Sequence, residues 1–134
     1  MTAAEEQKLL TAGTVVIVED DPLLQGIIAE MLLTVCPKCT VFGTADDALI
    51  HLLSAAKDCV LLIADHGVPG QLNGTEFIAM CRAKWPQIPA IITSGYELPA
   101  EFLPRGVDYL QKPWPLDLLL STVASALSPV QEEL

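Results

Sequence analysis

Five short, almost entirely apolar segments recur along this chain of 134 residues, and polar residues follow most of them closely. Continuous apolar runs, unlike alternating ones, are typical of strands that are buried on both faces. The five segments are residues 14–18, 40–42, 60–63, 89–92 and 107–110. Between and after them, apolar residues recur at helical spacing, most clearly over residues 22–32, 45–56 and 115–127 and at Phe77, Ile78 and Cys81. This alternation predicts a parallel sheet covered by helices on both faces, that is, a doubly wound α/β domain.

The length allows one domain of ordinary size. Residues 1–13 are polar or small and end in a glycine, so we expect a flexible N-terminal extension there. The predicted domain occupies residues 14–127, and residues 128–134 form a short acidic tail.

Seven Lys and Arg residues face 17 Asp and Glu residues, which gives a formal net charge of −10. This balance argues against binding to the phosphate backbone of nucleic acids or to anionic lipid. The acidic start of the chain lacks the features of a signal peptide, and the longest apolar run, residues 59–64, is too short to cross a bilayer. We therefore expect a cytoplasmic protein whose acidic residues either solvate the surface or gather around a cation.

The four cysteines fall into two groups. Cys59 and Cys81 lie in apolar patterns and are expected to be buried small hydrophobic residues. Cys36 and Cys39 form a C-x-x-C pair, but the pair follows a predicted helix and precedes a strand, the reverse of a thioredoxin-like arrangement. A zinc site would need two further ligands. Reduced thiols are the expectation, and a role for the Cys36 and Cys39 pair stays open.

Polar residues gather where four of the predicted strands end: Glu19, Asp20, Asp65, Ser94 and Lys112. In an open parallel sheet the carboxyl ends of the strands share one edge, where ligands bind. Three adjacent carboxylates repel one another unless a cation holds them, and oxygen ligands suit Mg²⁺. The ammonium and hydroxyl groups suit an anion beside the metal, and phosphate fits that arrangement. Each residue taken singly has a structural explanation, as a helix start, a cap, a turn or a surface charge, but all five together favour a site.

The chain resembles the receiver domain of two-component response regulators over roughly residues 14–127. The segments that carry the resemblance are VVIVEDDPLL (15–24), LLIADHGVPGQLNGTEF (61–77), PAIITSGY (89–96) and DYLQKPW (108–114). The resemblance implies a flavodoxin-like, five-stranded parallel sheet with strand order 2-1-3-4-5.

The resemblance also assigns roles to residues. Asp65 corresponds to the aspartate that accepts a phosphoryl group from a phosphohistidine. Glu19 and Asp20 correspond to the acidic pair that holds Mg²⁺ together with Asp65, and the backbone carbonyl of Gly67 would complete the metal ligands.

Three further positions match. Ser94 corresponds to the switch hydroxyl, Lys112 to the phosphate-binding lysine, and Tyr109 to the aromatic residue of the fifth strand that changes rotamer on phosphorylation. The family's Lys–Pro peptide bond is usually cis, which implies a cis bond between Lys112 and Pro113.

The chain departs from the common receiver pattern in two places. The stretch from Ser94 to Lys112 is about one helical turn shorter than usual and contains Pro99 and Pro104, so a short or irregular fourth helix is expected. A receiver subgroup with a Thr-Gly-aromatic motif and a short fourth helix is similar here. The loop over residues 65–74 is about one residue longer than the commonest form, and His66 within it is expected to face solvent.

We therefore expect a signalling phosphoacceptor that is not an enzyme beyond its own phosphorylation and dephosphorylation. Its expected partners are a histidine kinase or histidine phosphotransfer protein and an unknown downstream protein, with no nucleic acid or membrane, and the chain is expected to be a monomer or weak dimer. It would be either a stand-alone receiver or one excised from a hybrid histidine kinase. Two alternatives are a receiver that binds its partner without phosphorylation and a phosphohydrolase. The hydrolase would need a second carboxylate two residues after Asp65, where Gly67 stands.

Overall fold

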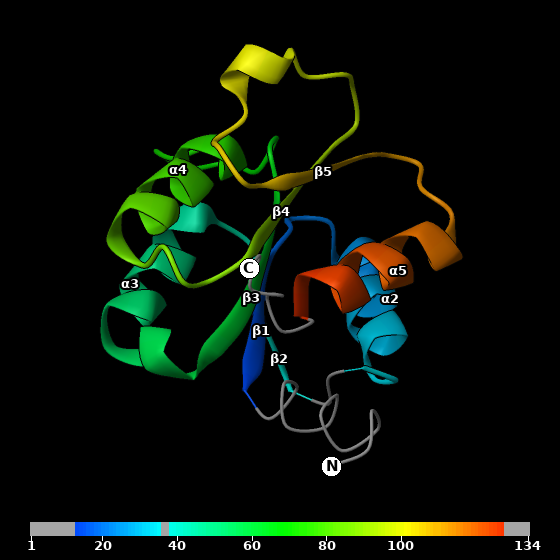
Figure 1. The fold of residues 1–134 in the computed structure, drawn as a ribbon, viewed down its shortest axis with the longest axis horizontal. Helices are drawn as coiled ribbons and strands as arrows, with labels where there is room; N and C mark the ends of the chain where they lie inside the picture. Colours follow the sequence, from blue (N-terminus) through cyan, green and yellow to red (C-terminus); the bar gives the residue numbers. More distant parts are fainter. Residues whose placement is uncertain (1–12, 36–37, 128–134) are drawn as a thin grey trace, which may run out of the picture.

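A parallel five-stranded sheet runs through the centre of the protein (Figure 1). The computed structural model describes residues 13–35 and 38–127, and within them the strand order is β2-β1-β3-β4-β5. The strands are β1 (Thr14–Val18), β2 (Cys39–Phe42), β3 (Cys59–Asp65), β4 (Ala90–Ser94) and β5 (Asp108–Gln111). The predicted flavodoxin-like order 2-1-3-4-5 is confirmed.

Four α-helices cover the two faces of this sheet in the described part of the chain. Figure 1 shows α3 (Ala45–Ala55) and α4 (Gly74–Lys84) on one face and α2 (Pro22–Leu32) and α5 (Leu116–Leu127) on the other. Two short 3₁₀ turns complete the elements, η1 (Ala56–Asp58) and η2 (Ala100–Phe102). The predicted doubly wound arrangement is therefore confirmed.

The sheet has an apolar core on each face because successive strand residues point to opposite sides. In β1, Val16 and Val18 belong to the cluster under α3 and α4, whereas Val15 and Ile17 belong to the cluster under α2 and α5. All four side chains are at most 1% exposed. Burial of one such side chain contributes roughly 1.5–3 kcal/mol to folding, which explains why these strands are continuous apolar runs.

Side-chain caps mark the beginnings of three helices. Asp21 precedes α2 and Thr44 precedes α3, and each accepts a hydrogen bond from a backbone N–H in the first turn of its helix. Asn73 and Glu76 form a reciprocal capping box at the start of α4. These caps end the loops at definite residues, so the polar groups just before each helix lie at the carboxyl edge of the sheet.

The segment between β4 and β5 contains no regular helix. Pro99 directly precedes the three residues of η2, and Pro104 follows one residue after it. No residue of η2 is buried. The prediction of a short or irregular fourth helix is thus confirmed: η2, a 3₁₀ turn of three residues, stands in its place.

Some predictions concern residues outside the described part of the chain. They concern residues 1–12 of the predicted extension (residues 1–13), the tail at residues 128–134, and Cys36. These predictions stay untested. Cys59 and Cys81 are free thiols and buried, as expected. Among the described residues, no helix has both the length and the apolar character needed to span a membrane.

Candidate functional site

Three carboxylates predicted to form one site lie together at the carboxyl edge of the sheet. One oxygen each of Glu19, Asp20 and Asp65 lies within 4.8 Å of the others. Glu19 directly follows β1 and Asp65 ends β3, and these two strands are hydrogen-bonded neighbours. Glu19 is 2% and Asp65 7% exposed, while Asp20 faces solvent. Two buried acids and one exposed acid therefore form a small cluster that opens to solvent.

Lys112 reaches the same cluster from the end of β5. Its Nζ lies 3.0 Å from Glu19 Oε1 and 3.0 Å from Asp65 Oδ1. Its backbone N–H donates to the Ser94 carbonyl at 2.7 Å, and the Lys112–Pro113 bond is cis, as the resemblance implies. With all four side chains ionised, three negative charges face one positive charge, which leaves −2 at the cluster.

Burial and charge shift the pKa values of two of these groups. Burial raises the pKa of Glu19 above its ordinary value, although hydrogen bonds from the Asp21 backbone N–H and from Lys112 oppose the rise. Burial acts to lower the pKa of Lys112, but its hydrogen bonds to Glu19 and Asp65 outweigh this effect, so the pKa lies above the ordinary value. Lys112 is therefore protonated at neutral pH, and a cation beside the buried Glu19 carboxylate would stabilise its charged form.

The surroundings of Asp65 include one predicted residue and one that sequence reasoning missed. A Cβ atom at Gly67 would lie 3.5 Å from Asp65 Oδ2, so the backbone of Gly67 passes beside the carboxylate. Thr93 is paired with Asp65 in the sheet register, and its Oγ1 lies 3.5 Å from Asp65 Oδ1, a long contact. Thr93 and Ser94 are the last two residues of β4. The sequence feature that could have identified Thr93 as a neighbour of Asp65 is its place beside Ser94 at the carboxyl end of this strand.

Ser94 and Tyr109 meet at one backbone carbonyl. Ser94 Oγ donates to the carbonyl oxygen of Tyr96 at 2.6 Å and accepts from the Tyr96 N–H at 3.1 Å. Tyr109 Oη donates to the same carbonyl oxygen at 2.8 Å and accepts from the Leu98 N–H at 3.2 Å. The hydroxyl of Ser94 is thus engaged with the segment after β4, and the structure shows no hydrogen bond from it to Asp65 among the described residues.

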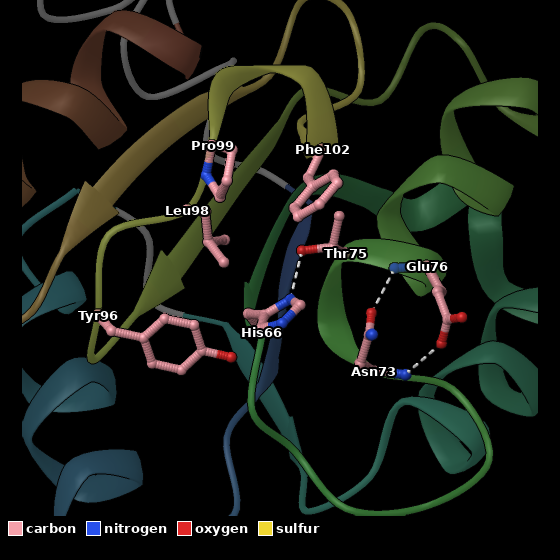
Figure 2. A pocket seen from close by; sticks show the side chains of 8 residues that line it. All are labelled: His66, Asn73, Thr75, Glu76, Tyr96, Leu98, Pro99 and Phe102. Atoms are coloured by element: carbon pink, nitrogen blue, oxygen red, sulfur yellow. Dashed lines mark hydrogen bonds between the residues drawn. The ribbon is translucent and has the colours of Figure 1, made fainter.

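A pocket of about 390 Å³ lies next to this site. Figure 2 shows it between the start of α4, with Thr75 and Glu76, and the segment after β4, with Tyr96, Pro99 and Phe102. His66 is half-buried here rather than solvent-facing as expected. The reason is a 2.7 Å contact between its Nδ1 and Thr75 Oγ1, with the ring edge-on to Tyr96 at 5.9 Å between centroids.

The arrangement has a definite chemical capacity. An all-oxygen cluster with a charge deficit suits a hard divalent cation, and a lysine within hydrogen-bonding distance suits the oxygens of an anion bound beside it. The carboxylate of Asp65 contacts Lys112 and also belongs to the acidic cluster. With a divalent cation held in the cluster, an anionic group at Asp65 would meet positive charge from the cation and from Lys112.

Comparisons with known proteins agree on one family. The response regulator receiver domain family matches residues 15–124. The hydrogenase transcriptional regulatory protein HoxA of Cupriavidus necator is 34% identical over 86% of this chain and 24% of its own length. The DNA-binding transcriptional regulator NtrC of Salmonella typhimurium is 28% identical over 90% of this chain and 26% of its own length. The chain thus spans about a quarter of the length of these relatives.

A solved structure shows the same fold. The response regulator receiver protein from Sinorhizobium medicae superimposes with a TM-score of 0.80 and 21% sequence identity, over 88% of this chain and 96% of that one. Together with the family match over residues 15–124, this shows that the chain belongs to the response regulator receiver domain family of two-component systems.

Proposed function

We propose that this receiver accepts a phosphoryl group from phosphohistidine on Asp65, with Mg²⁺ as cofactor, and thereby switches a protein-binding surface. The observation that carries the proposal is the position of Asp65, buried at the end of β3 and in contact with Lys112 at 3.0 Å within a three-carboxylate cluster.

The donor set fits the metal that the proposal requires. Glu19, Asp20 and Asp65 would hold Mg²⁺, with the backbone carbonyl of Gly67 as a further ligand. The charge of −2 at the cluster and the raised pKa of the buried Glu19 both favour a divalent cation there. When bound, Mg²⁺ would neutralise negative charge on the phosphoryl oxygens.

Asp65 would act as the nucleophile. A carboxylate oxygen forms a bond to phosphorus while the P–N bond to the donor histidine breaks, and the imidazole nitrogen keeps that electron pair and takes up a proton. Lys112 would donate hydrogen bonds to the phosphoryl oxygens, for which its raised pKa keeps it charged. The product is an acyl phosphate on Asp65.

The switch would pass through the Tyr96 carbonyl. Ser94 would exchange that carbonyl for a phosphoryl oxygen, which leaves Tyr109 as its only side-chain donor among the contacts described above. The segment after β4, which exposes Tyr96 and Phe102 at 58% and 61%, would then rearrange. An unknown downstream protein would read this change, and the donor would be a histidine kinase or histidine phosphotransfer protein.

The proposal also covers the location, the oligomeric state and the enzymatic activity of the protein. We propose a cytoplasmic monomer or weak dimer, either a stand-alone receiver or one excised from a hybrid histidine kinase. It catalyses no reaction beyond its own phosphorylation and dephosphorylation. The phosphohydrolase alternative is disfavoured by Gly67, which offers no side-chain acid or base beside Asp65.

Phosphorylation by a small donor tests the proposal. The chain is incubated with acetyl phosphate with and without MgCl₂, and its intact mass is measured. We expect a gain of one phosphoryl group that depends on Mg²⁺, is lost in Asp65→Asn and is retained in Asp108→Asn, which removes an exposed carboxylate on β5. An adduct that persists in Asp65→Asn, or its absence in the unmodified chain, would show that Asp65 is not the phosphoacceptor.

A further inference from the structure

The loop over residues 66–73, between β3 and α4, carries Gly67 past Asp65 and is held in three places. At its base, the Gly74 N–H donates to the His66 carbonyl at 3.1 Å, and His66 Nδ1 contacts Thr75 Oγ1 (Figure 2). Near Gly67, the Val68 side chain is 5% exposed within the core. The third attachment lies at the far end of the loop and comes from a different element.

That third attachment is Asp46, in the first turn of α3. Its Oδ2 accepts from the Gln71 N–H at 3.3 Å, and its Oδ1 accepts from the Leu72 N–H at 3.2 Å. These contacts join residues 25 and 26 positions apart in the chain. One carboxylate thus satisfies two consecutive backbone donors of the loop, with one oxygen for each.

Gly70 shows how closely the loop approaches this carboxylate. Its φ of +114° lies in the region that favours glycine, and a Cβ atom there would come within 2.7 Å of Asp46 Oδ1. The chain therefore turns directly over Asp46, and the predicted longer loop is closed onto α3.

The capping of α3 does not account for Asp46. Thr44 caps this helix by accepting the Asp47 N–H at 3.1 Å, whereas the Asp46 carboxylate accepts from another segment. Asp47 carries the same charge at the next position and is exposed. A general attraction between acidic residues and a helix N-terminus applies to both, so the loop contacts distinguish Asp46.

We propose that Asp46 is a positioning residue for the metal site: by fixing Gln71 and Leu72, it holds the loop so that the backbone of Gly67, whose carbonyl would bind the metal, stays beside Asp65. The inference rests on the proposed function, because it concerns the Mg²⁺ that Glu19, Asp20 and Asp65 would bind. Residues that orient metal ligands commonly change metal affinity by about 10–100-fold when they are removed.

Mg²⁺ titration of the full chain tests this role. Calorimetry measures the Kd for Mg²⁺ in the unmodified chain, in Asp46→Ala and in the matched control Asp47→Ala, at constant ionic strength. We expect Asp46→Ala to raise Kd about tenfold and Asp47→Ala to change it less than about twofold. Asp46→Asn keeps one carbonyl acceptor, so we expect its Kd to lie between those of the unmodified chain and Asp46→Ala. If Asp46→Ala does not fold, Asp46→Asn takes its place and Asp47→Asn is the matched control.

The rate of phosphorylation by acetyl phosphate separates positioning from general damage. For Asp46→Ala we expect a higher Mg²⁺ requirement, with a rate at saturating Mg²⁺ within about twofold of the unmodified chain, since the metal then orders the loop itself. Equal Kd values in the two alanine variants, or a rate that stays low at saturating Mg²⁺, would overturn the role of Asp46. Failure of the unmodified chain to bind Mg²⁺ would instead overturn the proposed metal site.

Discussion

The two loops that flank Asp65 differ in how tightly they are held. The loop between β3 and α4 is joined to the rest of the protein through Asp46, Val68 and the contact between His66 and Thr75. The segment between β4 and β5 contains η2, which buries none of its residues, and exposes Tyr96 and Phe102. Leu98 of this segment is 6% exposed in the same core cluster as Val68, and Tyr109 holds the segment through two hydrogen bonds, but its middle part, η2, has no buried residue.

This difference suits the two tasks of the proposed site. Metal ligands have to stay within a few tenths of an ångström of their positions, which requires a loop with many attachments. A switch needs an element with two arrangements of similar free energy, and few buried contacts give it that freedom. The loop between β3 and α4 would help to bind Mg²⁺, and the segment between β4 and β5 would rearrange on phosphorylation.

Alanine replacement of one glycine beside each segment should give the largest difference between them in the free energy of unfolding. A Cβ atom at Gly74 would lie 2.1 Å from the Asp65 carbonyl oxygen, whereas Gly95, directly after β4, has nothing within 4 Å. We expect Gly74→Ala to lower the free energy of unfolding by about 3 kcal/mol or more, because backbone has to move, and Gly95→Ala to change it by less than about 0.5 kcal/mol. Urea unfolding measures both. Similar losses in the two variants would mean that the two segments are equally constrained.

The next effect concerns the hydroxyl of Tyr109. Tyr109→Phe removes its hydrogen bonds to the Tyr96 carbonyl and the Leu98 N–H, which lie near solvent, so we expect a loss of about 1 kcal/mol in stability. Amide hydrogen exchange should quicken in residues 96–103 and stay unchanged in residues 66–73. The loop over residues 66–73 serves as the internal control. Unchanged exchange in residues 96–103 would show that Tyr109 does not hold this segment.

Sequence patterns predicted the sheet and the carboxylate cluster well, for a physical reason. The run Thr14–Val18 became β1 with the predicted bounds, because an apolar strand buried on both faces ends where polar residues begin. Parallel strands then bring their carboxyl ends together, which placed Glu19 beside Asp65 without any knowledge of side-chain positions.

What the sequence could not predict are contacts that depend on loop paths. Asp46 meets Gln71 only because Gly70 turns the chain over α3, and the residue types alone do not record that path. The shared acceptor of Ser94 and Tyr109 is a backbone carbonyl, a group that every residue carries. His66 was expected in solvent because its partner Thr75 lies across the loop, nine residues away.

The smallest expected effect is the pH dependence of stability that two buried thiols cause, Cys59 at the start of β3 and Cys81 in α4. Burial raises the pKa of Cys59 to about 11 and that of Cys81 to about 12, from an ordinary value of 9.0. In the unfolded chain both thiols ionise near pH 9, so the stability that their neutral form contributes is complete below that pH and is lost as the pH rises toward 11–12. Between about pH 8 and 9.5 we expect a loss of less than about 1 kcal/mol per thiol. Urea midpoints measured across this range in the unmodified chain and in Cys81→Ala should show a shallower decline in the variant. Identical slopes would mean that Cys81 ionises as readily in the folded protein as in the unfolded chain. The core around Cys81, where α4 packs on β3, would then open to solvent far more often than its burial indicates.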